Sequence, residues 1–371
     1  MSQPTPSLRE DDADHDLRAM LREMADRLFE QQYTRQVQAS AQEGQWPQAL
    51  WHSVTQAGLT SAAVPQALGG AGASLADAAL IMRACGHHAL ALPLVETLIG
   101  NWLLAQAGCQ ADTGVLALGP VLPAKPVQLV RESARWTLSA RIACVPWAMD
   151  AQHFVTVAQL PDGAQAVILA PLEAAQVDTA PNIAGEPRCQ IEFDQLDLTG
   201  RMFELPAGLD HAAALFRLGA LARCQQMVGA MEWILEHSLV YARERVQFGK
   251  PIGGFQAIGH MAAVMATQVS AAQVAADAGM MAFGSEAADL SAGYAKARVG
   301  EAAGEVAALA HQLHGAMGYS HEYPLHWRTR RLWAWRDEFG GELHWNTQAG
   351  KLLAKRGGAA LWSGMTLSFE L

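Results

Sequence analysis

The sequence predicts a mainly α-helical chain with a central β domain. Among its 371 residues, apolar residues recur every three or four positions up to about residue 110, as in amphipathic helices. Short strand-like runs follow, separated by Pro, Gly and Asp, and long helical segments return near residue 207. We therefore expect a flexible acidic tail at 1–13, an N-terminal helical domain at 14–110, a small central antiparallel β barrel or sheet at 111–206, and a C-terminal four-helix bundle at 207–371.

The N-terminal helices carry recognisable starting signals. A helical pattern runs from residue 47 to 59, and a loop rich in glycine and proline follows at 65–74. We expect Ser74 to cap the next helix together with Asp77, and Pro93 to occupy the first position of another helix. The apolar residues of the first helix share one face: Leu17, Met20, Leu21, Met24 and Leu28.

The central region has the composition of short strands. Turn-forming residues separate the runs at the spacing of a compact antiparallel domain. Six strands are expected, at Val115–Leu118, Val127–Val130, Trp136–Val145, His153–Val157, Ala166–Leu169 and Cys189–Phe193.

The C-terminal region contains three long helical segments and a final stretch rich in Trp and Arg. The segments are expected at 210–245, 256–283 and 287–317, and their short joints favour a four-helix bundle. Residues 251–276 include no Asp, Glu, Lys or Arg, which is long enough to span a bilayer. Because polar residues such as His260 interrupt this stretch, we expect instead a helix buried on most sides within the bundle.

The composition excludes several classes of protein. With 51 % hydrophobic and 17 % charged residues the chain can bury a large core, and its net charge of −10 argues against nucleic acid as the main partner. The five cysteines form no CxxC pair, and the N-terminus is polar and acidic, unlike a signal peptide. We therefore expect a cytoplasmic protein with reduced cysteines and no membrane span.

Several common catalytic motifs are missing from the sequence. It contains no GxxxxGK[ST], GxSxG or HExxH, and Gly70-Ala71-Gly72 lacks the third glycine of a dinucleotide turn. The histidine pairs His87-His88 and His311/His314 lack the spacing of a metal site, so we expect them to cap or pack helices, with no bound metal.

Two segments have the composition of a ligand site. The first runs from Tyr241 to Gln256 and joins a basic helix end, a glycine turn and the start of a new helix. Its arginines suit phosphate, and Phe248 can stack on a flat ring. The second, Gln312–Pro324, places small residues where a ligand can approach the backbone. On spacing alone, both segments are equally consistent with ordinary helix ends.

These segments resemble motifs of the acyl-CoA dehydrogenase family of flavoproteins. Arg245 begins R-x-x-F-G-x-x-I-x-x-F-Q and Gln312 begins Q-x-x-G-x-x-G-Y-x-x-E-Y-P, while the loop from Pro65 to Ser74 resembles the family's P-x-x-x-GG-x-G segment. The resemblance implies an FAD-dependent oxidoreductase that removes the α-proton of an acyl-CoA with a carboxylate and transfers the β-hydride to flavin N5. It also implies β-oxidation of fatty acids or steroids, with electron-transfer flavoprotein as acceptor.

The resemblance also implies where FAD binds, at a boundary between subunits. Arg245 matches the residue that contacts the pyrophosphate, with neighbours on the adenine half and a facing contact from another subunit. Ala316 replaces the second glycine that the family usually has at this point. The implied cofactor residues are Arg245, Gln247, Phe248, Ile252, Phe255, Gln256, Gln312 and Gly315.

The catalytic base departs from the family pattern. Counting forward from Gly318, the usual glutamate position falls on Phe339; a slip of one residue selects Glu338, and Glu342 is the next candidate. A smaller group of the family carries the base on the first bundle helix, at a position that is Gly219 here. The family's T-E-P-x-x-G-S-D segment has no counterpart between residues 112 and 136.

These departures resemble the small subunits of heteromeric acyl-CoA dehydrogenases, in which a partner chain supplies the base. The alternatives are a homo-oligomer, dimer or tetramer, that uses Glu338 or Glu342, and a non-catalytic structural or acyl-CoA-binding homologue. The cluster of Arg328, Arg330, Arg331 and Arg336 is consistent with phosphate binding or with a solvated helix face paired with Asp337, Glu338 and Glu342. The neighbouring tryptophans are expected in the bundle core or an interface: Trp327, Trp333, Trp335 and Trp345.

Overall fold

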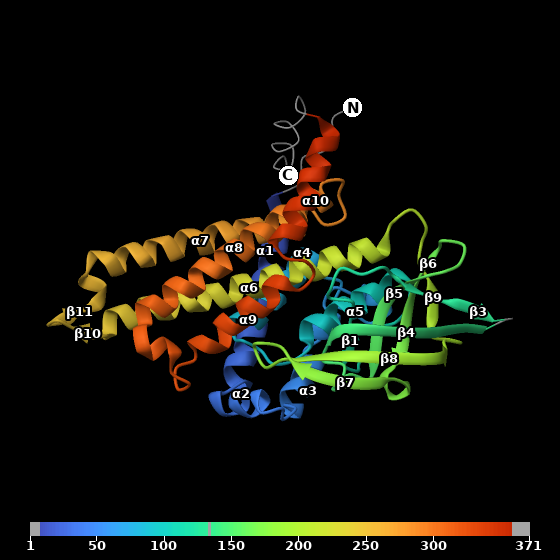
Figure 1. The fold of residues 1–371 in the computed structure, drawn as a ribbon, viewed down its shortest axis with the longest axis horizontal. Helices are drawn as coiled ribbons and strands as arrows, with labels where there is room; N and C mark the ends of the chain where they lie inside the picture. The colour runs from blue at the N-terminus through green and yellow to red at the C-terminus, as the bar shows by residue number, and fades with distance from the viewer. Residues whose placement is uncertain (1–7, 133–134, 358–371) are drawn as a thin grey trace.

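A computed structural model describes residues 8–132 and 135–357 of the chain. The helical bundle occupies one half of the molecule and the β domain the other, with the N-terminal helices packed against both (Figure 1). This order of helices, sheets and helices confirms the predicted fold class.

Five helices form the N-terminal region: α1 (Leu8–Gln32), α2 (Arg35–Gln42), α3 (Gln48–Gln56), α4 (Leu75–His87) and α5 (Leu94–Gln106). The predicted capping box is present, because Ser74 accepts a hydrogen bond from the Asp77 amide and Asp77 accepts one from the Ser74 amide. Pro93 precedes α5 as its N-cap, one position earlier than predicted. Residues 8–13, expected within a flexible tail, are helical, whereas residues 1–7 lie outside the described residues.

The β domain is two sheets packed face to face, and within the described residues it forms no closed barrel. One sheet has the order β1-β5-β6-β9, with β2 beside β5, and the other has the order β3-β4-β8-β7. Buried residues from both sheets, including Ile142, Phe154, Ile168 and Phe193, form the core between them. The strands are β1 (Leu116–Leu118), β2 (Val127–Gln128), β3 (Val130–Glu132), β4 (Arg135–Pro146), β5 (His153–Gln159), β6 (Gln165–Pro171), β7 (Gln176–Pro181), β8 (Pro187–Asp197) and β9 (Met202–Glu204).

The pairing of the strands differs from prediction in two respects. β1 and β2 both run parallel to β5, whereas a wholly antiparallel domain was expected. The strands β7 and β9, which lie at sheet edges, were not predicted. β7 is almost entirely exposed, so it lacks the alternation of buried and exposed residues by which a strand is recognised.

The C-terminal bundle consists of α6 (His211–Glu244), α7 (Gln256–Met281), α8 (Ala288–His314), α9 (Leu325–Asp337) and α10 (Glu342–Arg356). The short strands β10 (Val246–Gln247) and β11 (Lys250–Pro251) join α6 to α7. α6 lies at the centre, and every residue from 218 to 231 is buried. Only six residues of α7 are buried, so the prediction that this uncharged helix is enclosed on most sides is wrong.

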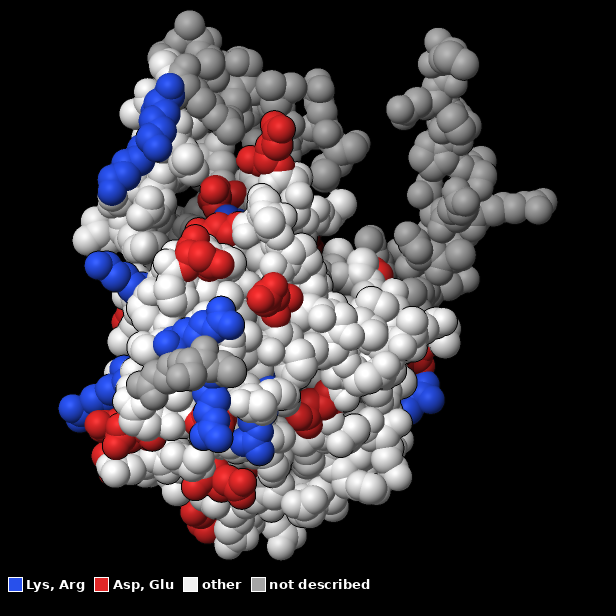
Figure 2. All heavy atoms as spheres, turned by 90° about the vertical axis from the view of Figure 1, so that its right-hand side faces the viewer, with Lys and Arg blue, Asp and Glu red and all other residues white. Residues whose placement is uncertain are grey.

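The surface shows no dominant charge on the face drawn in Figure 2. Acidic and basic side chains are interspersed and separated by uncharged surface. Within the described residues, no helix has both the length and the apolar character needed to cross a membrane.

Candidate functional site

The joint between α6 and α7 is a tight hairpin that projects from the end of the bundle. Phe248 and Gly249 both have positive φ, 52° and 81°, which is the geometry of a two-residue type I′ turn. The amide of Ile252 donates to the carbonyl of Arg245 at 2.8 Å and closes the hairpin. Phe248 is 92 % exposed, so its aromatic ring projects from the hairpin into solvent.

The end of α8 lies beside this hairpin. The Tyr241 hydroxyl, one turn before Arg245, donates to the carbonyl of His314 at 3.4 Å, and the two rings are 4.5 Å apart. Gly315 follows directly with φ 56°, and a Cβ added there would meet nothing within 4 Å. Two segments separated by some seventy residues thus form one end of the bundle (Figure 1).

The predicted cofactor residues gather at this end and are open to solvent. Arg245, Gln247, Gln256 and Gln312 are exposed and supply guanidinium and amide donors; Ile252 and Phe255 are half-buried behind them. Phe255 lies 6.1 Å from the Phe248 ring, edge to face. This donor set, beside an unobstructed glycine, fits the pyrophosphate and adenine of FAD.

Glu338, the first candidate for the base, lies in a buried ion-pair cluster. One carboxylate oxygen accepts from Arg188 Nε at 2.7 Å and the other accepts from Arg223 Nε at 2.8 Å. The side chain is 7 % exposed. With both oxygens held by guanidinium groups, this carboxylate has no open side toward a substrate C–H bond.

The cluster continues from Glu338 into all three regions of the chain. Arg223 Nη2 donates to Glu96 in α5 at 2.7 Å, and Arg188 Nη2 donates to Glu186 at 2.9 Å. Glu186 also accepts from Arg331 Nε and Trp335 Nε1, both at 3.0 Å. We call this balanced set of three carboxylates and three guanidinium groups the junction cluster: Glu96, Glu186, Arg188, Arg223, Arg331 and Glu338.

Electrostatics within the junction cluster favour the ionised form of Glu186. Burial on its own raises the pKa of Glu186, but the neighbouring guanidinium groups of Arg331 and Arg188 hold that pKa at about 2. Arg331 and Trp335 also pin α9 against the start of β8. The junction cluster therefore joins the N-terminal helices, the β domain and the C-terminal bundle, and it includes Glu338, the first candidate for the catalytic base.

Both positions that the family resemblance assigns to a base meet at one point in space. Gly219 of α6 packs directly beneath the ring of Phe339, and a Cβ added to Gly219 would overlap that ring. Phe339 is 4 % exposed and has φ 55°. Its amide donates to the carbonyl of Val121 at 2.6 Å, which ties the α9–α10 loop to the β domain. The position of the base is thus filled by a phenyl ring.

Glu342, the second candidate for the base, also interacts with an arginine of this chain. It forms an ion pair with Arg336, and a Cβ added at Gly300 of α8 would overlap its carboxylate. Lys296 of α8 holds the loop between α9 and α10. This residue is 1 % exposed, and its ammonium group donates to the carbonyl of Gly340 at 2.9 Å.

A small cavity of about 290 Å³ lies beside Phe339. Pro120, Thr156, Phe216 and His344 are among the residues that line it. The Phe216 ring is 5.7 Å from the ring of Phe339, edge to face. The proline-rich loop at 119–126, within the stretch that has no counterpart of the family's T-E-P segment, forms one wall.

The arginines of α9 have partners inside the chain: the pairing of Arg336 with Glu342 agrees with the predicted solvated face, whereas Arg328 and Arg331 are buried and do not belong to such a face. Arg328 donates to the carbonyl of His87 and lies 3.5 Å above the Trp233 ring, and Arg331 is fully buried. Arg330 donates to the carbonyl of Ile183, and Arg336 pairs with Glu342. Of the neighbouring tryptophans, Trp327, Trp335 and Trp345 are buried as predicted, and Trp333 is 38 % exposed.

The histidine pairs pack within the helices. His88 forms a hydrogen bond with Asp26 at 3.0 Å, and the His87 ring lies edge to face against the His88 ring, with centroids 5.1 Å apart. His311 bonds Thr329 and His314 bonds Tyr323, both at 3.0 Å. No group of three metal-ligating side chains occurs in the part of the chain that the structure describes.

Most of the junction cluster was not predicted from the sequence. Arg223 and Glu96 are isolated charges within long apolar stretches, which is a sign of a buried ionic partner. Their partners lie more than one hundred residues away along the chain, so the sequence does not identify them.

Comparison with known proteins agrees with the fold and the motifs. The N-terminal domain model of the acyl-CoA dehydrogenase family matches residues 15–112, and its C-terminal domain model matches residues 207–336. The acyl-CoA dehydrogenase FadE27 of Mycobacterium tuberculosis is 27 % identical over 310 residues, covering 76 % of this chain and 82 % of that protein.

Two solved structures have the same fold. A chain in the crystal structure of the ChsE4-ChsE5 complex of M. tuberculosis has a TM-score of 0.83 at 22 % identity, covering 96 % of this chain and 99 % of its own length. A chain from a variant of the Tcur3481-Tcur3483 steroid ACAD has a TM-score of 0.83 at 24 % identity, covering 94 % and 99 %. Since both domain models match on either side of the central sheets, this chain belongs to the acyl-CoA dehydrogenase family of FAD flavoproteins.

Proposed function

We propose that this chain is one subunit of a heteromeric acyl-CoA dehydrogenase whose partner chain supplies the catalytic base. The observation that carries the proposal is the contact between Phe339 and Gly219. A proton can be removed only by a basic group that reaches the substrate, and neither position offers one. The two nearby glutamates are held by arginines, so neither replaces the missing base.

In this proposal the chain contributes cofactor binding, through the exposed end of its bundle. The residues at that end would hold FAD, whose flavin would supply the acceptor for the hydride of the acyl-CoA β-carbon. Arg245 holds the pyrophosphate by charge-assisted hydrogen bonds, and the amides of Gln247 and Gln256 bind the adenine half. Gln312 and Gly315 form the facing contact toward the partner subunit.

The relatives support a heteromer that acts on bulky acyl-CoA substrates. One structural neighbour is named as a complex of two different chains, and another is described as a steroid ACAD. We infer α,β-dehydrogenation of a bulky acyl-CoA, as in steroid side-chain degradation, with electrons passed to an electron-transfer flavoprotein. The five free cysteines support a cytoplasmic location for this activity.

Two other functions make different predictions about purified protein. A self-sufficient homo-oligomer that uses Glu338 or Glu342 binds FAD and turns over acyl-CoA when expressed alone. A non-catalytic homologue shows no turnover in any combination. The contact of Phe339 with Gly219 favours the heteromer over the first, and the exposed cofactor residues favour it over the second.

The test is expression with and without homologous chains encoded beside it. We expect the chain alone to be inactive, and co-expression with one neighbouring homologue to give a yellow complex that oxidises acyl-CoA. Changing the aligned glutamate of that partner to Gln should abolish turnover while FAD stays bound. Full activity of this chain alone would overturn the proposal, as would inactivity with every neighbouring homologue.

A further inference from the structure

A cavity of about 340 Å³ lies where the three regions of the chain meet, and none of the predicted cofactor residues lines it. Its wall is formed by the loop between α2 and α3, the turn after β4, the end of β7 with the start of β8, and Arg331 of α9. The exposed residues Glu43 and Met149 mark its open side, whereas Arg331, which is 0 % exposed, marks its closed end. This volume is within the range of small-molecule sites in proteins.

Arg331 brings an unsatisfied hydrogen-bond donor to this cavity. Its Nε donates to Glu186 at 3.0 Å, and its Nη1 donates to the carbonyl of Trp327 at 2.9 Å. Its Nη2 is also buried, yet this atom has no hydrogen-bond partner among the described residues. A buried donor on a charged group is costly when it stays unsatisfied, so we expect an acceptor from outside the chain at this position.

Two tryptophans give the cavity flat apolar walls. Trp46 is half-buried in the loop between α2 and α3, and Trp147 is 8 % exposed in the turn after β4. The Trp147 backbone has φ 59°, in the left-handed region that a bulky residue seldom adopts. Strain of this kind concentrates at binding sites, where the surrounding structure holds a side chain in place. Indole rings in such a position favour contact with a flat ring of a ligand.

The charges around the cavity argue against an anionic ligand. The junction cluster, to which Arg331 and Glu186 belong, is already balanced in charge. Two further carboxylates, Glu43 and Asp150, line the cavity. Burial raises the pKa of Asp150, which indicates that its carboxylate is poorly solvated. These carboxylates would repel an added negative charge, whereas a neutral carbonyl oxygen can accept from the Arg331 Nη2 without adding charge.

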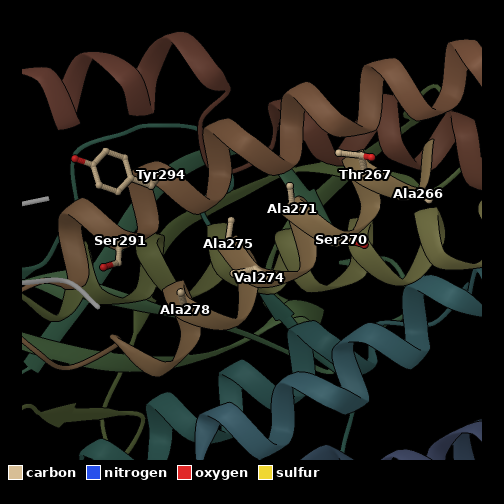
Figure 3. Close-up of a pocket in the computed structure, with 9 residues that line it drawn as sticks. All are labelled: Ala266, Thr267, Ser270, Ala271, Val274, Ala275, Ala278, Ser291 and Tyr294. Carbon is tan, nitrogen blue, oxygen red and sulfur yellow. The ribbon is translucent and has the colours of Figure 1, made fainter. Parts of the chain in front are cut away.

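The groove beside α7 lacks these features. It has a volume of about 750 Å³ and is lined mainly by small side chains such as Ala271 and Ala275, with no charged residue (Figure 3). It therefore offers no buried charged donor that could orient a small ligand.

We propose that the cavity at Arg331 binds a neutral aromatic carbonyl compound, whose ring lies against Trp46 and Trp147 and whose oxygen accepts a hydrogen bond from Arg331 Nη2. The occupant completes the hydrogen bonding of a side chain that joins α9 to β8 through Glu186. This site is separate from the proposed flavin site and does not depend on which chain supplies the base.

The test measures the affinity of three probes for the full chain, alone and in its co-expressed complex, by ligand-observed NMR and calorimetry. Benzamide carries both the ring and the carbonyl oxygen, toluene lacks the acceptor, and benzoate adds a negative charge. We expect benzamide to bind at least about tenfold more tightly than either of the others, because it alone satisfies the charged donor without repulsion.

Three variants locate the site. Trp46→Ala removes one wall at a half-buried position and should weaken benzamide binding at least about tenfold. Trp333→Ala is the matched control, because this 38 % exposed tryptophan of α9 does not line the cavity, and it should bind benzamide as the wild type does. Asp150→Asn keeps the shape of the side chain and should raise the affinity for benzoate while leaving that for benzamide unchanged.

A crystal soaked with benzamide tests the geometry directly. The benzamide oxygen should lie within hydrogen-bond distance of Arg331 Nη2. Four results would each overturn the proposal: a water molecule at Nη2 with no benzamide in the cavity, equal affinities for benzamide and toluene, tighter binding of benzoate than of benzamide, or undiminished benzamide binding by Trp46→Ala.

Discussion

At the scale of single residues, the contact between Phe339 and Gly219 is the observation on which the proposed partner-supplied base depends. A glutamate at either position would need the space that the phenyl ring and the glycine now share. The ring contacts Phe216 and lies 6.0 Å from the Arg223 guanidinium, and the backbone N–H of Phe339 donates a hydrogen bond to the Val121 carbonyl. The site is therefore a packed core and not an empty catalytic pocket.

Removal of this ring should be costly for stability. Phe339→Ala leaves a cavity against Gly219, and we expect a loss of about 3–5 kcal/mol in the free energy of unfolding, measured in urea. Phe248→Ala removes the same group from a 92 % exposed site and should change stability by less than about 0.5 kcal/mol. Equal losses for the two variants would contradict the packing described here.

The acid sensitivity of Glu186 provides a second test. Its pKa is about 2 in the folded chain, below the ordinary value of 4.5, so its ion pairs stabilise the fold fully above pH 4.5. This contribution, roughly 3 kcal/mol, is lost progressively as the pH falls from about 4.5 toward 2. We expect the unfolding free energy of Glu186→Gln to depend less on pH over this range than that of the wild type. Parallel curves for the two proteins would exclude the role assigned to Glu186.

At the scale of elements, the loop between α9 and α10 is held by groups from three directions. Lys296 donates to its Gly340 carbonyl, the Val121 carbonyl accepts from its backbone, and Arg188 and Arg223 hold Glu338 at its start. Buried ion pairs stabilise a fold less than apolar packing does, but breaking one leaves an unpaired charge. These contacts therefore fix the position of the α9–α10 loop for structural reasons, independently of any catalytic base.

Glu338→Gln separates a structural role from a catalytic one. We expect the variant to lose about 3–5 kcal/mol of stability, because two buried arginines lose their shared carboxylate. The heteromeric enzyme containing it should keep the wild-type kcat at temperatures where it remains folded. Loss of turnover without loss of stability would identify Glu338 as the base and restore the self-sufficient alternative.

At the scale of the whole molecule, cofactor binding and domain packing are segregated. The exposed end of the bundle carries the residues that we propose to bind FAD, while the junction cluster ties the three regions together through buried ion pairs. In the proposed heteromer, this division leaves one end of the chain open to the partner subunit, while buried ion pairs hold the three regions together.

Arg245→Ala should uncouple cofactor binding from assembly. We expect the co-expressed complex to form but to lose at least about tenfold in FAD affinity, since a charge-assisted contact to phosphate contributes about 1.5–3 kcal/mol. Arg243→Ala, an exposed arginine two residues earlier, is the matched control and should retain FAD. Flavin absorbance relative to protein measures the outcome, and equal loss in both variants would argue against a specific role for Arg245.

The sequence by itself determined the order of the three regions and the capping box at Ser74. These features depend on residues close together in the chain, whose spacing and turn chemistry act locally. Only the tertiary structure decided that α6 is enclosed and α7 exposed, since apolar composition does not specify which surface covers a helix. It alone decided that Glu338 lies between arginines and that Phe339 covers Gly219, because those contacts join residues that are distant in sequence and adjacent only in the folded chain.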